Sequence, residues 1–147
     1  MRAQAFRLAS VLKLRRHQLD AAARELAARR RAVERAAREL QRSQGRALRE
    51  HLRLGEWIAS GVAAGRYHAG SAGVARLAER ARQVGNELER SREQAERSRQ
   101  ALLAARTRVR ALERLRERAA RHWRWQEQRA EQRELDEVGQ RRWEGRA

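Results

Sequence analysis

The chain has 147 residues, of which 37% are charged and 4% aromatic, and it carries a formal net charge of +17. It contains no cysteine, which excludes disulfide bonds and thiolate metal sites. No stretch approaches the roughly 20 apolar residues of a membrane span, and charged residues interrupt the N-terminal segment, so we expect no transmembrane helix and no signal peptide. The expected protein is soluble and cytosolic. Its alanine, arginine, glutamate, leucine and glutamine, with no proline, favour long helices.

The first predicted element is a helix over about residues 5–57. One apolar or small residue recurs every seven positions along it, as in the seam of a coiled coil. The positions are Leu12, Leu19, Leu26, Val33, Leu40, Ala47 and Leu54. Glutamates placed four positions before arginines predict surface ion pairs, Glu25 with Arg29 and Glu34 with Arg38.

A glycine-rich segment over about residues 58–71 is predicted to be the turn of a hairpin. Five of the nine glycines lie between residues 55 and 73. Each costs up to about 1 kcal/mol in a helix relative to alanine, so a continuous helix is not expected here. Ser71 is a candidate N-cap for the helix that follows.

The second predicted helix spans about residues 72–138 and has a denser seam. Its apolar and small residues recur in alternating steps of three and four. They are Val74, Leu77, Ala81, Val84, Leu88, Ser91, Ala95, Ser98, Leu102, Ala105, Val109 and Leu112. Beyond them the stripe shifts to Leu115, Ala119 and Trp123. The segment 139–147 is predicted to be a frayed tail.

These elements predict an all-α fold, a long antiparallel two-helix coiled-coil hairpin that forms a single coiled-coil domain over 1–147. Antiparallel pairing across the turn brings Leu40 opposite Leu88 and Leu26 opposite Leu102. A parallel homodimer is the competing arrangement. The glycine cluster disfavours it, because a parallel dimer needs one continuous helix per chain and the glycines would interrupt that helix.

Aromatic residues gather at the expected open end of the hairpin. The pairing places Phe6 beside Trp123 and Trp125, so we predict that Phe6 packs against one of them. The second helix is expected to extend beyond the first by one or several turns. Residues two apart point to different faces of a helix, so at least one of the two tryptophans is expected to be exposed. Exposed tryptophans often anchor interfaces, and Trp125 is the candidate.

The positive charge is dispersed, with a net charge of +9 over residues 1–56 and +8 over residues 57–147. This pattern favours a solvated helix surface. The alternative is a basic coiled-coil module that binds nucleic acid or an anionic membrane.

Nothing in the sequence predicts an enzyme, a metal site or a cofactor. The four histidines have no ligand-type spacing, and no phosphate-binding glycine loop is present. Paired carboxylates need a concave site, which a two-helix rod does not offer.

Three segments carry a family resemblance. The opening FRLASVLKLRR, from Phe6 to Arg16, resembles the start of the flagellar FliJ family. The run ALERLRER, from Ala111 to Arg118, is similar to a C-terminal motif of that family, and EQRELDE, from Glu131 to Glu137, is similar to its closing acidic segment.

The resemblance implies a soluble cytoplasmic component of the flagellar type III export apparatus, peripheral at the inner face of the cell membrane. It implies a coiled coil similar to the central stalk of rotary ATPases. Such a stalk engages the hexameric ring of the export ATPase and the cytoplasmic domain of the export gate, and handles export chaperones. The equivalent stalk of a virulence-type secretion system is an alternative.

The resemblance also implies that the ends of the two helices face the ATPase ring. The residues concerned are Phe6, Arg7, Leu8, Leu12, Leu14, Leu112, Arg114, Leu115, Arg116, Arg118, Leu135 and Asp136. Trp125 joins this set as the exposed aromatic. No specific nucleic-acid partner is expected.

Overall fold

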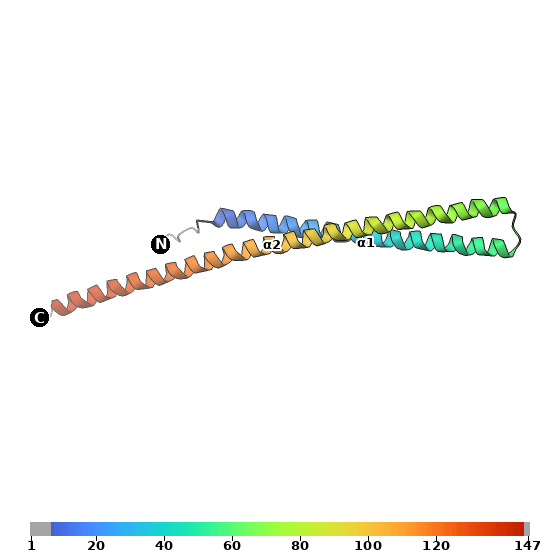
Figure 1. Cartoon of the computed structure of the whole chain (residues 1–147). Helices are drawn as coiled ribbons and strands as arrows, with labels where there is room; N and C mark the ends of the chain where they lie inside the picture. The colour runs from blue at the N-terminus through green and yellow to red at the C-terminus, as the bar shows by residue number, and fades with distance from the viewer. Residues whose placement is uncertain (1–6, 146–147) are drawn as a thin grey trace. The chain divides into compact units, whose positions relative to one another are not determined.

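The computed structural model describes residues 7–145, which form two long helices and no strand (Figure 1). Helix α1 spans Ala9–Ala59 and helix α2 spans Ala64–Glu144. The predicted all-α helical hairpin is confirmed.

The chain divides into two compact structural units. The hairpin unit consists of residues 20–103 and contains the turn. The terminal unit consists of the chain up to Leu19 and the chain from Ala104 onward. That the whole chain behaves as a single domain stays a prediction.

The core of the hairpin unit is the predicted pair of seams. Val84 is 1% exposed and Leu88 4% exposed, so both side chains lie fully between the helices. The other seam residues of the unit are buried or half-buried, namely Leu26, Val33, Leu40, Ala47 and Leu54 in α1, and Val74, Leu77, Ala81, Ser91, Ala95, Ser98 and Leu102 in α2. Burial of one side of each helix is what stabilises such a long pair.

The turn is a short, specific helix stop, and it corrects the predicted boundaries. Gly61 has a φ of 74°, its N–H donates to the carbonyl of Ile58 at 3.2 Å, and the N–H of Val62 donates to the carbonyl of Trp57 at 3.2 Å. These two bonds form a Schellman motif, which ends a helix with glycine in the left-handed region. Between the two helices only residues 60–63 are non-helical, whereas the prediction was a turn over 58–71.

Four of the five glycines between residues 55 and 73 are therefore helical. Gly55 lies in α1, and Gly65, Gly70 and Gly73 lie in α2. At Gly70 the packing of the two helices favours glycine over a larger residue, because a Cβ there would lie 2.9 Å from Leu54 Cδ1. The close approach of the two helices near the turn outweighs the helix propensity that the glycine loses. Helix α2 starts at Ala64, so the prediction of Ser71 as an N-cap was wrong.

The shorter turn also shifts the pairing register. The guanidinium Nη1 of Arg29 donates to Gln94 Oε1 at 2.7 Å, and Leu40 Cδ1 lies 3.9 Å from the position that a Cβ on Gly85 would occupy. Residue numbers across the pair thus sum to 123 and 125, not to the predicted 128. A turn centred near residue 62 instead of 64 accounts for this shift of about one helical turn.

The C-terminal boundary differs as well. Helix α2 continues through Gly139 to Glu144, beyond the predicted end at residue 138. Arg141 and Arg142 lie in its last turn, where positive charge is favourable at a helix C-terminus. In this region the predicted frayed tail is helical.

Candidate functional site

In the terminal unit the beginning of α1 packs against α2. Leu12 and Val109 are 4% and 5% exposed. Arg16 Nη2 donates to Glu113 Oε1 at 2.7 Å, which ties the two helices together across the surface. The residue numbers of this ion pair sum to 129, about one helical turn from the sums of 123 and 125 in the hairpin unit, an offset that long arginine and glutamate side chains can span.

This pairing determines where α2 loses its partner. Helix α1 starts at Ala9, so the register of the Arg16–Glu113 pair leaves α2 without an α1 residue opposite it after about residue 120. The remaining segment, residues 121–144, extends for roughly 36 Å at 1.5 Å per residue. The predicted extension of the second helix beyond the first is confirmed.

The predicted site residues divide into one buried residue and a largely exposed set. Leu12 is buried and therefore supports the helix pair. Leu112 is half-buried. Exposed positions are Arg7, Leu8, Leu14, Arg114, Leu115, Arg116, Arg118, Trp125, Leu135 and Asp136. Phe6 lies outside the described residues, so its predicted packing against Trp123 or Trp125 stays a prediction.

Several exposed apolar residues lie on one side of this helix pair. At about 100° per residue, Val11 lies about 100° to one side of Leu12 and Arg16 about 40° to the other. On α2, Glu113 and Leu115 lie on opposite sides of Leu112 by the same count. Because Arg16 meets Glu113 on one side, Val11 and Leu115 share the other side.

We call these residues the apolar strip, which consists of Leu8, Val11 and Leu14, running in steps of three from the edge of the α1 seam towards its outward face, and of Leu115 of α2. Their exposed fractions are 37%, 38%, 55% and 44%. Sequence reasoning missed Val11, although its spacing of three from both Leu8 and Leu14 was a usable signal. The common side became visible only once the ion pair fixed how the helices face each other.

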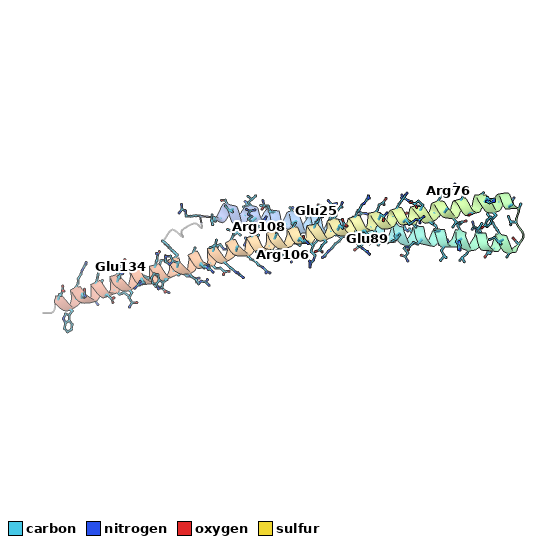
Figure 2. The ribbon with its side chains drawn as sticks, viewed as in Figure 1. Glu25, Arg76, Glu89, Arg106, Arg108 and Glu134 are labelled. Carbon is cyan, nitrogen blue, oxygen red and sulfur yellow. The ribbon has the colours of Figure 1, made fainter. Side chains whose placement is uncertain are left out.

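The surroundings of the strip are strongly basic. Residues 7–19 and 104–118 together contain ten basic and two acidic side chains, a net charge of +8. Arginines such as Arg106 and Arg108 project from α2 (Figure 2). The charge is therefore less evenly dispersed than the comparison of residues 1–56 with residues 57–147 indicated. By contrast, residues 119–144 carry six basic and six acidic side chains and are neutral.

Trp125 lies in an ordered cluster on one face of α2. The His122 ring stacks on it with centroids 5.9 Å apart, and Arg129 Cζ lies 4.6 Å from the centroid of the indole ring. His122 Nε2 and Gln126 Nε2 are 2.9 Å apart. These neighbours hold the indole in place while half of it stays exposed. Trp123 is half-buried, so the expectation that at least one of the two is exposed is met by Trp125.

Among the described residues, no cluster of potential metal ligands lies beside this surface. Within residues 7–145, no three histidine, aspartate or glutamate side chains are grouped so as to hold a metal ion. In the same range no helix is both long enough and apolar enough to cross a membrane. What the geometry offers is a contact surface, apolar in its middle and positively charged around it.

The comparisons with known proteins identify the family. A family model described as "Flagellar FliJ protein" matches residues 4–147, essentially the whole chain. No curated protein sequence matches. No solved structure matches. The resemblance of the three sequence segments is thereby confirmed, and this chain belongs to the flagellar FliJ family, whose members are components of the flagellar protein export apparatus.

Proposed function

We propose that this chain is the stalk of the flagellar export apparatus, a single coiled-coil domain that engages the export ATPase ring through its terminal unit. In this proposal it also contacts the cytoplasmic domain of the export gate and export chaperones, it is held at the inner face of the cell membrane by these partners, and it has no catalytic site. The family match supports the flagellar system over the equivalent virulence-type stalk.

One observation carries the proposal: the apolar strip lies within the most basic part of the described chain. Leu14 and Leu115 are about half exposed. Contact of these apolar side chains with water is unfavourable, so a partner that covers them gains free energy. Arg114 and Arg118 are exposed beside Leu115 on the same helix and suit carboxylates on a partner surface.

The proposed interface has the usual anatomy of a protein contact. Leucine side chains form its desolvated centre, and arginines form a rim that steers and orients the partner. Trp125, Leu135 and Asp136 lie on the extension of α2 beyond residue 120 and would meet a partner that continues past the end of α1. Leu12, being buried, contributes only by holding the helix pair together.

Co-purification with the export ATPase tests the proposal. We expect Arg114→Glu with Arg118→Glu to weaken binding at least about tenfold, because both charges reverse at the rim. The matched control is Arg90→Glu with Arg97→Glu, two exposed arginines of the hairpin unit that bring the same change in net charge. Leu14→Ala with Leu115→Ala tests the apolar centre, and Leu48→Ala with Leu52→Ala is its exposed control. Full binding by both terminal-unit variants would remove this interface.

A further inference from the structure

A second concentration of arginine lies on the hairpin unit and shares no residue with the proposed ATPase interface. Arg24, Arg31 and Arg38 each stand two positions before a seam residue of α1, and Arg35, Arg42 and Arg49 each stand two positions after one. Two residues correspond to about 200° around a helix, so all six lie on the face opposite the seam. We call these six residues the arginine row.

The arginine row is unneutralised within the protein. All six side chains are exposed, and in the described part of the chain no ion pair within 4.0 Å involves any of them. The predicted pair of Glu34 with Arg38 is absent there, whereas Glu25 and Arg29 do pair at 2.7 Å. Arg31 with Arg35, and Arg38 with Arg42, are like charges four apart, which destabilises a helix.

The opposite helix of the same unit has a different outward face. By the same count of two residues from a seam residue, α2 holds four arginines and four glutamates, namely Arg76, Arg82, Arg90 and Arg97 with Glu79, Glu89, Glu93 and Glu96. Three arginines of this helix are paired locally, Arg82 with Glu79, Arg92 with Glu89 and Arg99 with Glu96, whereas within the described residues no ion pair involves Arg76, Arg80, Arg90 or Arg97. The hairpin unit therefore has one basic face and one face without excess positive charge, and projecting side chains line both helices (Figure 2).

We propose that the arginine row binds directly to the surface of an anionic lipid bilayer. The row extends over 25 residue steps, roughly 38 Å at 1.5 Å per residue, along a single face of one helix. A plane of anionic headgroups can meet all six guanidinium groups at once, because negative charge is present everywhere in that plane. The flexible arginine stems let the groups settle at headgroup level.

Nucleic acid fits the row less well. A B-form duplex winds once in about 34–36 Å, so a straight row beside it would meet a phosphate ridge at only a few points. Single strands are held by stacking on aromatic rings, and residues 24–49 contain no aromatic residue. The bilayer proposal does not depend on the ATPase interface, since its residues are different.

Sedimentation with lipid vesicles tests the inference on the full chain. We expect binding to phosphatidylcholine vesicles that contain phosphatidylglycerol, no binding to phosphatidylcholine alone, and release when the salt is raised to about 0.5 M. The variant Arg31→Gln, Arg35→Gln, Arg38→Gln, Arg42→Gln should bind at least about 30-fold more weakly. Its control is Arg76→Gln, Arg80→Gln, Arg90→Gln, Arg97→Gln, which removes the same charge from α2 and should lose less than about threefold.

A variant in which Arg31, Arg35, Arg38 and Arg42 are replaced by lysine keeps the charge. It therefore separates the effect of charge on vesicle binding from an effect on folding. This variant should keep the binding of the parent chain, because the bilayer reads charge and not guanidinium geometry. Circular dichroism should show the same helix content in all variants. Equal losses in the two glutamine variants would mean that net charge alone acts, and would overturn the proposal. Absence of binding to anionic vesicles at low salt, or tighter binding of a DNA duplex than of vesicles through the same four arginines, would overturn it as well.

Discussion

The close approach of the two helices beside the turn predicts opposite effects for two neighbouring Gly→Ala substitutions. In α2, a Cβ at Gly73 would meet no atom within 4 Å, whereas a Cβ at Gly70 would lie 2.9 Å from Leu54 Cδ1 and 3.2 Å from Trp57 Cζ3. Both glycines lie inside the same helix, so the intrinsic gain from alanine is the same at the two sites.

The sizes of the helix-propensity gain and of the overpacking cost decide whether each substitution stabilises or destabilises the chain. Replacement of a helical glycine by alanine contributes about 0.8–1.0 kcal/mol, so Gly73→Ala should raise the free energy of unfolding by about that amount. At Gly70 the added methyl group must displace Leu54, which is only 9% exposed, and overpacking of this kind costs about 1–3 kcal/mol. Gly70→Ala should therefore lower the free energy of unfolding by about 0–2 kcal/mol.

Urea unfolding followed by circular dichroism at the helix band measures both values, with a common slope for the variants. A third variant, Gly70→Ala combined with Leu54→Ala, should recover much of the gain seen at Gly73, measured relative to Leu54→Ala alone, because the clashing methyl group is gone. If Gly70→Ala stabilises the chain as much as Gly73→Ala does, the described helix contact beside the turn does not exist.

Three further outcomes are expected. Gly61→Ala should destabilise the chain by about 1–2 kcal/mol in urea unfolding, because alanine pays for the left-handed backbone at the end of α1, and no change would argue against the Schellman turn. Val84→Ala should lower the free energy of unfolding by about 1–3 kcal/mol, since this side chain is 1% exposed. Val138→Ala, at a residue that is 52% exposed, should change it by less than about 0.5 kcal/mol. Similar values at the two sites would contradict the assigned core. In hydrogen exchange, the amides of residues 130–144 should exchange much faster than those around Val84, because every residue of this stretch is exposed and a helix without a packed partner opens locally; equal protection would contradict the absence of a described partner here.

Both seams could be predicted from the sequence because burial follows a local period. Every heptad residue from Leu12 to Leu54 and every seam residue from Val74 to Leu112 is buried or half-buried. A period of 3.5 residues needs no knowledge of the partner, only that one side of each helix is covered. This is why the fold class followed directly from composition and spacing.

The turn was misplaced because glycine composition was given more weight than packing. A glycine costs about 1 kcal/mol in a helix, a penalty that tertiary contacts easily exceed. The contact of Gly70 with Leu54 is a property of two segments, and no local pattern reveals it. The end of α1 depends on Gly61 alone, which the sequence could not distinguish from its four neighbouring glycines.

The candidate surfaces were predictable to different degrees. Leu8, Leu14 and Leu115 were named from a family motif, but their common side with Val11 depends on how Arg16 meets Glu113. The arginine row, in contrast, could have been found by counting two positions from each seam residue. It was missed because net charge was summed over long stretches and not over helix faces.

The central claim is that one chain folds back on itself so that residues 16 and 113 are neighbours. Spin labels on His17→Cys and Arg114→Cys, in a chain with no other cysteine and diluted with unlabelled protein, measure this distance directly. Helices packed about 8–10 Å apart predict a label separation below about 30 Å that does not change on dilution. A continuous helix would separate the two sites by roughly 145 Å, so a distance beyond the reach of the labels, or a short distance that disappears on dilution, would contradict the account.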